Sequence, residues 1–360
     1  MLTKAQQNAL EYIKRSAAKR RNDDLQRIAS ALSAAELDVE VDELIASVRK
    51  IATLTSNFHP DRLISDGRSV IAALYEDGIY RSQFETKISN GGLTAHPGGD
   101  RDRWEERMLG GAYQAEGVTD AERPKYGGLN LMNYKDGACP RFGSCHLRLK
   151  HSILSNATLT FGDSNSDPTD IGVIDAFEPV LAGLLEHIAG ESNALGRKDV
   201  SVADFVNALL SDDTDFFQPV QGRALDDYIE AQIHGELNLA HEVEAIVADP
   251  SFQGTATGET IEATAKKYGV PLEWHDGFEL TLDEIHDDFR GPEMPPLAKR
   301  VLANHAVDGE HIDAATIGMA AVSVVTNPQS WADWGNSKDT LQHIKYLWHT
   351  LVVYGKPNRD

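Results

Sequence analysis

The stretch DDYIEAQIHGELNLAHEVEAIVADP, from Asp226 to Pro250, decides how the rest of the chain is interpreted. Its first part alternates as a strand does, with Ile229, Ala231 and Ile233 on one face. The opposite face carries an aromatic ring, a carboxylate, an amide and an imidazole, from Tyr228, Glu230, Gln232 and His234. Such a face either lies in water, as is common in antiparallel sheets, or forms the floor of a cleft.

The composition is that of a soluble globular protein. The chain has 360 residues, of which 41% are hydrophobic and 25% are charged, and this length allows two or three compact units. No apolar run reaches the roughly 20 residues that cross a bilayer. The first residues, MLTKAQQNALEYIKRSAAKRRNDD, lack the apolar core of a secretory signal. We therefore expect a cytoplasmic protein, and export by a route without such a signal stays open.

The charge is strongly acidic, with a formal net value of −22. Such a surface repels phosphate backbones, so nonspecific nucleic-acid binding is not expected, although KRSAAKRR (Lys14 to Arg21) is a short basic patch. The two cysteines, Cys139 and Cys145, fit neither a CxxC redox pair nor a common zinc half-site. We predict that both are reduced and structural.

The remaining patterns predict an α+β fold with strands in the centre and helices at both ends. Helical spacing covers 3–50, and a short Thr-rich strand ends at Pro60 before a helix that ends at Gly78. The Gly-rich region 89–113 is predicted to be irregular. PRFGSCHLRLK and ATLTFGDS alternate like strands, and EVEAIVADP is predicted to pair with the strand around Glu230. Helices are predicted near 170–190 and 201–210 and from 295 onward.

Three parts follow from this order. We expect a helical N-terminal arm over 1–50, a core over 51–290 with a helical insert near 170–210, and a helical C-terminal region over 291–360. Strands and helices are segregated, which favours α+β over a doubly wound sheet. Neither GxGxxG after a strand nor GxxxxGK[ST] occurs, so Rossmann and P-loop folds are not predicted.

Three stretches together resemble the signatures of the ADP-ribosyltransferase superfamily, particularly its bacterial toxin-like members. YIEAQIHGELNLAHEVEAIVADP resembles the third signature, a strand that begins with the catalytic glutamate. FHPDRLISDGRSVIAALYEDGIY is similar to the first, and RPKYGGLNL and PRFGSCHLRL lie where the second should fall. The elements HPDR, SNGGL, PRFGSCH and EAQ-HG also resemble those of a bacterial family of uncharacterised proteins. The resemblance covers roughly 51–255.

The resemblance implies a split antiparallel β core, with two small sheets around a cleft, and cleavage of NAD. ADP-ribose would pass to an acceptor that the sequence does not identify, or to water. The signatures take the form Arg-Ser-Glu or His-Tyr-Glu, so Glu230 is the implied catalytic carboxylate, and Tyr126 and Ser144 compete for the second position. Tyr228 stands two residues before Glu230, where families that modify arginine often have an acidic or amide residue, which counts against arginine as the acceptor.

The nucleotide-binding residues are also implied by the resemblance. His59, Arg62 and Arg81 compete for the first signature, and either arginine could hold the pyrophosphate with a bidentate fork. Tyr126 or Phe142 could stack on the nicotinamide ring. The predicted contacts to NAD also include Asn90, Gly91, Arg141, Gly143 and Gln232. No metal ion is needed.

Two other classes of function stay open. A metal-dependent hydrolase could draw ligands from HPD, WHDGF and IHDDF, through His59, Asp61, His275, Asp276 and the residues His286 to Asp288. A non-enzymatic interaction protein could dock through its helical ends. Burial of Tyr228, Glu230 and His234 would argue against that class. A Cys145 nucleophile beside His146 is disfavoured, because neighbours on a strand point to opposite faces.

Overall fold

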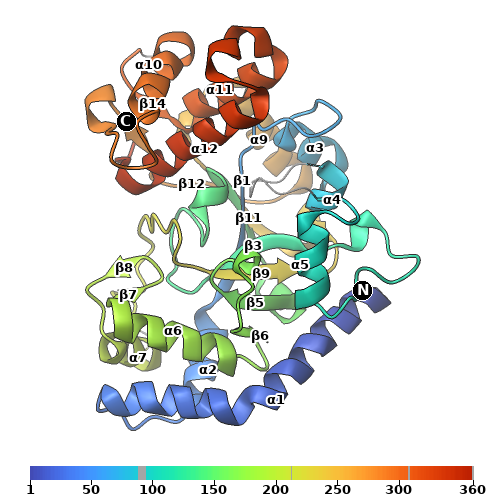
Figure 1. The fold of residues 1–360 in the computed structure, drawn as a ribbon, viewed down its shortest axis with the longest axis vertical. Helices are drawn as coiled ribbons and strands as arrows, with labels where there is room; N and C mark the ends of the chain where they lie inside the picture. Colours follow the sequence, from blue (N-terminus) through green and yellow to red (C-terminus); the bar gives the residue numbers. More distant parts are fainter. Residues whose placement is uncertain (88–94, 212, 307–308, 359–360) are drawn as a thin grey trace. The chain divides into compact units, whose positions relative to one another are not determined.

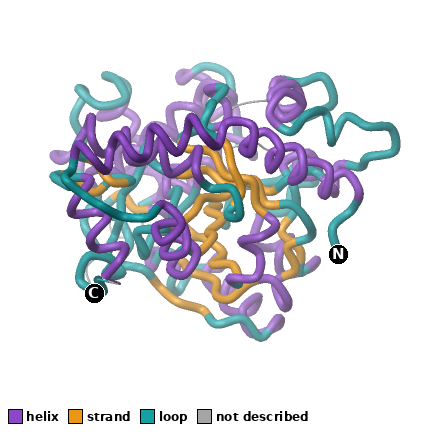
Figure 2. The backbone as a smooth tube through the Cα atoms, turned by 90° about the horizontal axis from the view of Figure 1, so that it is seen from below, coloured by secondary structure: helices purple, strands orange, loops and turns teal. Residues whose placement is uncertain are grey.

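The computed structural model describes residues 1–87, 95–211, 213–306 and 309–358. It confirms the α+β prediction, since the chain combines many helices with one large mixed sheet (Figures 1 and 2). The described helices are α1 (Lys4–Ala34), α2 (Val41–Ile51), α3 (Val70–Asp77), α4 (Gln83–Thr86), α5 (Asp100–Met108), α6 (Glu178–Glu191), α7 (Val202–Ser211), α8 (Leu239–Glu242), α9 (Ala256–Tyr268), α10 (Met294–His305), α11 (Ala314–Thr326) and α12 (Ser337–Tyr354). Within this part of the chain, no helix combines the length and the apolar composition that a membrane span requires.

The described strands are β1 (Thr53–Phe58), β2 (Ile79–Tyr80), β3 (Lys125–Asn130), β4 (Cys145–Leu149), β5 (Ala157–Phe161), β6 (Ile171–Val173), β7 (Asn193–Ala194), β8 (Arg197–Lys198), β9 (Ile229–Ile233), β10 (Leu237–Asn238), β11 (Val243–Ala248), β12 (Leu272–Trp274), β13 (Glu279–Leu280) and β14 (Ile312–Asp313). Eight of them form one sheet in the order β12-β11-β4-β1-β3-β9-β5-β6. The pairing from β1 through β3, β9 and β5 to β6 is antiparallel, whereas β11 and β12 are parallel. The described strands therefore do not form the two small sheets that the resemblance implied.

The predicted pairing of EVEAIVADP with the Glu230 strand is wrong. Strand β9 has β3 on one side and β5 on the other, so both of its edges are occupied. The link after β9 forms β10, which pairs with β2 and turns the chain away before β11 begins. Strand β11 then lies between β12 and β4.

The chain divides into two compact units, each assembled from separate stretches. The first unit comprises Met1–Ser56, Ile79–Cys139 and Arg148–Glu244, and the second comprises Asn57–Gly78, Pro140–Leu147 and Ala245–Asp360. Strands β1, β4 and β11 each contain a boundary between the units. The three parts predicted from the order of the sequence stay a prediction.

In the first unit, the helical structure predicted over 3–50 is confirmed, and it forms α1 and α2. Helix α1 packs along α6, and α2 packs on α7 (Figure 1). The N-terminal half of α1 buries Leu10 and Ile13 against Met108 and Leu109 at the end of α5 and Val173 in β6. This apolar contact fixes α5 beside the sheet.

Helix α5 corrects a prediction, because 89–113 was expected to be irregular throughout. Its buried face is largely polar and includes Arg101, Asp102 and Glu105 beside Trp104 and Met108. A polar buried face produces no apolar period, which is the signal from which helices are predicted. The helix is nevertheless one of the elements that build the site described below.

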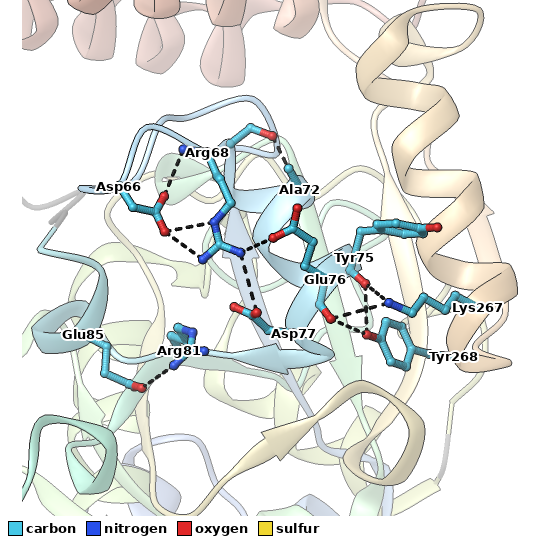
Figure 3. A network of polar contacts seen from close by, with 11 residues as sticks. Asp66, Arg68, Ala72, Tyr75, Glu76, Asp77, Arg81, Glu85, Lys267 and Tyr268 are labelled. Atoms are coloured by element: carbon cyan, nitrogen blue, oxygen red, sulfur yellow. Dashed lines mark hydrogen bonds and ion pairs between the residues drawn. The ribbon is translucent and has the colours of Figure 1, made fainter.

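In the second unit, the helix predicted to end at Gly78 is α3, and Gly78 has the left-handed conformation (φ 68°) typical of a C-terminal glycine. The last carbonyl groups of α3 accept hydrogen bonds from Lys267 and Tyr268 of α9 (Figure 3). The Tyr268 ring occupies the space that a Cβ at Gly78 would need. The helices predicted from 295 onward are α10, α11 and α12, and they pack against one another.

Candidate functional site

The polar face of β9 continues across its two neighbouring strands. Glu230 lies opposite Gly128 of β3 and Thr160 of β5, and Gln232 lies opposite Tyr126 and Thr158. Directly paired residues of antiparallel strands project from the same face of a sheet. Side chains from three consecutive strands therefore surround Glu230.

This face is buried. The exposed fractions are 2% for Tyr228, 5% for Glu230, 0% for Gln232 and 1% for His234. The interpretation of the face as solvated is therefore wrong. Polar groups that are removed from water need hydrogen-bond partners, so the contacts of these side chains determine what the face can do.

A directed chain of hydrogen bonds ends on Glu230. The Tyr113 hydroxyl donates to His234 Nδ1 at 2.5 Å, and His234 Nε2 donates to Thr158 Oγ1 at 3.2 Å. Thr158 donates in turn to Gln232 Oε1, and Gln232 Nε2 donates to Glu230 Oε1, both at 2.8 Å. Burial, and then the charge of Lys125, lower the pKa of His234 to about 3, so its ring is neutral and can both accept and donate. The chain fixes the orientation of the Glu230 carboxyl group.

Helix α5 covers this part of the sheet with an arginine held between two rings. The Arg101 guanidinium lies 4.4 Å from the centre of the Trp104 ring and 4.3 Å from that of Tyr126. The Tyr126 hydroxyl donates to Glu105 Oε1 at 2.8 Å. Arg101, Trp104 and Glu105 were not predicted as site residues. Their spacing of three and four positions was the signal that could have revealed them, since it places all three on one helical face.

A second arginine connects the acidic groups of α5. Arg123, which is 5% exposed, bonds Glu105 at 2.9 Å and Asp102 at 2.6 Å. Burial raises the pKa of Glu105, and the charges of Arg101 and Arg123 oppose that rise. Carboxylates and guanidinium groups therefore alternate under α5, which compensates part of the cost of burying charge.

Glu230 titrates close to neutral pH. Its pKa is raised to about 7, mainly by burial and then by the nearby charge of Asp163, whereas Ser164, Gln232 and Arg101 oppose the rise. Ser164 stabilises the charged form of Glu230, although its hydroxyl completes no hydrogen bond of normal geometry with the described residues. A carboxyl group with such a pKa can exchange a proton at physiological pH.

A cavity in the first unit reaches Ser164 and so lies one side chain away from Glu230. Its volume is about 320 Å³, at the lower end of the roughly 300–1,000 Å³ of small-molecule pockets. Helix α1 contributes Tyr12 and Arg20, α5 contributes Arg107 and Met108, and residues 167–171 complete the wall. Two cations, Arg20 and Arg107, therefore line a cavity that extends to Ser164, next to the buried carboxyl group of Glu230.

In the second unit, the motifs HPDR and PRFGSCH pack together. Asn57 Nδ2 donates to the Gly143 carbonyl at 3.3 Å, and a Cβ at Gly143 would lie 2.1 Å from the Phe58 carbonyl carbon, which only glycine avoids. Trp348 of α12 joins the motifs: its Nε1 donates to Pro140 O at 2.8 Å, and its ring contacts the His59 ring edge-on at 5.1 Å. Burial, and then Arg62, lower the pKa of His59 to about 3.

A model of the family DUF3626, described as proteins of unknown function, matches residues 53–354. The chain belongs to this family. No curated protein matches it. The DUF3626 match includes β9 with Glu230, β3 with Tyr126, and both motifs of the second unit.

The predicted residues of this DUF3626 protein fall into two groups. Glu230, Gln232 and Tyr126 lie together in the first unit. The second unit holds a larger set: His59, Arg62, Arg141, Phe142, Gly143 and Ser144. Ser144 precedes β4, which is not a neighbour of β9 in the sheet.

The other predicted nucleotide contacts are placed differently. Arg81 lies in the first unit and forms an ion pair with Glu85 at 3.1 Å (Figure 3). Asn90 and Gly91 lie outside the described residues.

The geometry gives less support to a metal-dependent hydrolase or a cysteine nucleophile. Among the residues that the structure describes, no three His, Cys, Asp or Glu side chains are grouped so that they could hold a metal ion. His275 contacts Ser144 O through Nε2 and the Gly277 amide through Nδ1, so both ring nitrogens are engaged. Neither Cys139 nor Cys145 forms a disulfide, and both are buried. Burial raises the pKa of Cys145, which disfavours a thiolate nucleophile.

Proposed function

We propose that this DUF3626 protein is an ADP-ribosyltransferase that cleaves NAD and passes ADP-ribose to an acceptor or to water. The observation that carries the proposal is the adjacency of three strands. β1 leads into the stretch that resembles the first signature, β3 carries a candidate for the second, and β9 carries the third. They are consecutive in the sheet, in the order β1-β3-β9. The strands that precede or carry the three weak resemblances are thus neighbours in one sheet.

The strand order favours one of the two candidates for the second signature. Tyr126 lies on the strand paired with β9 and on the same face as Glu230, whereas Ser144 precedes a strand that does not neighbour β9. The proposal therefore takes Tyr126 as the second member beside Glu230 and leaves the first member open among His59, Arg62 and Arg81.

The reaction suits one positioned carboxylate. Cleavage of the bond between nicotinamide and ribose passes through an oxocarbenium-like state, as glycoside cleavage does. Nicotinamide leaves without needing a proton, so the demand on the protein is to stabilise positive charge on the ribose. Ionised Glu230 meets this demand and can accept a hydrogen bond from the ribose 2′-hydroxyl. Gln232 holds one carboxylate oxygen at 2.8 Å, so little reorganisation is needed.

The pKa of Glu230 adds a pH dependence to the proposal. A pKa of about 7 means that half of the carboxyl groups are protonated at that pH. Only the ionised carboxylate stabilises the positive charge of the oxocarbenium-like state. We therefore expect kcat/KM to rise with pH and to level off above about pH 7 to 8.

The test is release of nicotinamide from NAD by the full chain and by Glu230→Gln. The substitution keeps the shape and removes the charge, so turnover should fall by roughly 100- to 1000-fold. NAD affinity should change little, because the cation exists only in the transition state. Glu236→Gln is the matched control, since Glu236 is exposed in the same segment and should not affect turnover.

Two outcomes would count against the proposal. Turnover by Glu230→Gln at the parent rate would remove Glu230 from the chemistry. Turnover that is lost on chelation and restored by zinc or manganese would favour the metal-dependent hydrolase instead. The burial of Tyr228, Glu230 and His234 disfavours the interaction protein, because a docking surface does not require these side chains inside.

A further inference from the structure

The cavity beside Ser164 lies within the first unit and has an apolar interior. Its buried wall comes from α1 and α5, through Ile13, Ala17 and Met108. Tyr12, also on α1, lies at the rim, since 43% of this residue is exposed. A volume of about 320 Å³ and an apolar wall together fit a molecule with a small apolar body.

The charged groups at the rim of the cavity are paired with one another. Arg107 forms an ion pair with Asp167 at 2.8 Å, and both residues line the cavity. The guanidinium group of Arg20 is held by Asp24 at 3.1 Å and by Asp170 at 3.2 Å. A charged ligand would lose its water without gaining an unpaired counter-ion, which is costly. We therefore expect a neutral ligand.

Ser164 is the polar group of the buried wall, and it is 2% exposed. Its Oγ has no hydrogen-bond partner of normal geometry among the described residues. A hydroxyl group that is removed from water without such a partner is costly, so it calls for an explanation. Ser164 lies close enough to Glu230 to stabilise the ionised carboxyl group and so to oppose the rise of its pKa. The lone pairs of Oγ remain available to a donor from the cavity.

We propose that this cavity binds a small neutral alcohol, whose hydroxyl group donates to Ser164 Oγ and whose apolar body packs between α1 and α5. A hydroxyl group fits because it can donate to Oγ while the Ser164 proton stays directed at Glu230. An amine fits less well, because it is ionised at neutral pH. Ile13 and Met108 remove the apolar body from water. The proposal concerns binding alone and does not depend on the proposed activity of Glu230.

The experiment compares three compounds of similar size by ligand-observed NMR titration of the full chain. They are benzyl alcohol, toluene, which lacks the hydroxyl group, and benzoate, which is an anion. We expect benzyl alcohol to bind saturably and roughly 2- to 10-fold more tightly than toluene, the effect of one neutral hydrogen bond. Benzoate should bind more weakly than benzyl alcohol, because the cations at the rim are already paired.

Two variants locate the site. Ser164→Ala removes only the hydroxyl group, so benzyl alcohol should lose its advantage over toluene, whereas the affinity for toluene should not change. Ser16→Phe places a ring in the cavity from a half-buried position on α1 and should abolish binding of both compounds. The matched control is Ser166→Ala, which should change neither affinity, since Ser166 is exposed at the end of the same short turn, Ser164–Ser166.

Three results would overturn the inference. They are no saturable binding of benzyl alcohol at millimolar concentration, a preference for it over toluene that Ser164→Ala leaves unchanged, and tighter binding of benzoate than of benzyl alcohol. Ser164→Ala leaves no buried hydroxyl group unsatisfied, so this variant should fold as the parent does. All titrations are made without NAD, so their outcome is separate from that of the nicotinamide assay.

Discussion

His234 and His349 are buried to the same degree, each 1% exposed, but they differ in what surrounds them. His234 uses both ring nitrogens in a chain of hydrogen bonds that ends on Glu230. His349 has no hydrogen-bond partner among the described residues, and burial, followed by the charge of Arg290, lowers its pKa. The first environment is a complete set of hydrogen bonds that orients a carboxyl group, whereas the second leaves both ring nitrogens without a hydrogen-bond partner among the described residues. Equal burial therefore does not mean equal function.

The largest effect should come from breaking the charge network under α5. Arg123→Leu leaves Glu105 and Asp102 without their shared guanidinium partner, and removing one member of a buried ion pair costs about 3–5 kcal/mol. Urea unfolding measures this change. Arg103→Leu on the same helix should cost little, because its ion pair with Asp100 is exposed. Equal losses for both variants would show that the network does not stabilise the first unit.

The next effect is a stabilisation that depends on pH. The pKa of Glu230 rises from 4.5 in the unfolded chain to about 7, so the stability contributed by its protonated form is full below pH 4.5 and is lost as pH rises through 7. Glu230→Gln cannot ionise and should be more stable than the parent by about 3 kcal/mol at about pH 8, with no such gain at about pH 4. Unfolding curves at the two pH values measure this difference. A gain in stability of the same size at both pH values would show that it does not come from the titration of Glu230.

Replacement of His234 tests whether the hydrogen bonds around this buried ring stabilise the fold. His234→Phe fills a similar volume but leaves the Tyr113 hydroxyl without its acceptor and Thr158 without its donor. Each buried group left unsatisfied costs about 1–3 kcal/mol, so the melting temperature should fall clearly. A variant as stable as the parent would mean that the chain to Glu230 contributes nothing to folding.

The smallest effect is expected for the matched change at the other histidine. His349→Phe removes no hydrogen bond within the described residues, so its stability should stay within about 1 kcal/mol of the parent. A loss as large as that for His234→Phe would remove the contrast between the two sites.

Apolar periodicity explains what could be predicted from the sequence. Leu10, Ile13, Leu44 and Val48 recur at helical intervals, and they are buried in α1 and α2. Alternation likewise identified the strand that carries Glu230. These patterns are local, and burial against a neighbouring element follows from them.

What could not be predicted depends on polar burial and on distant pairing. Helix α5 turns Arg101 and Glu105 inward, and such a face looks like a solvated loop in the sequence. The neighbours of β9 come from residues more than 60 positions earlier, because β10 pairs with β2 and separates β11 from β9. His349 received no prediction, because neither its burial nor its lack of hydrogen-bond partners among the described residues follows from the local sequence pattern.

The division of the chain into two interleaved units has a consequence for biosynthesis. The backbone passes from one unit to the other after Ser56, Gly78, Cys139, Leu147 and Glu244. The early segments of the second unit thus leave the ribosome long before residues 245–360, most of their unit, have been made. Neither unit can be produced by shortening the gene at one end. A nascent chain that stalls before residue 245 would carry these segments unpaired, so we expect it to be a substrate for chaperones and proteases.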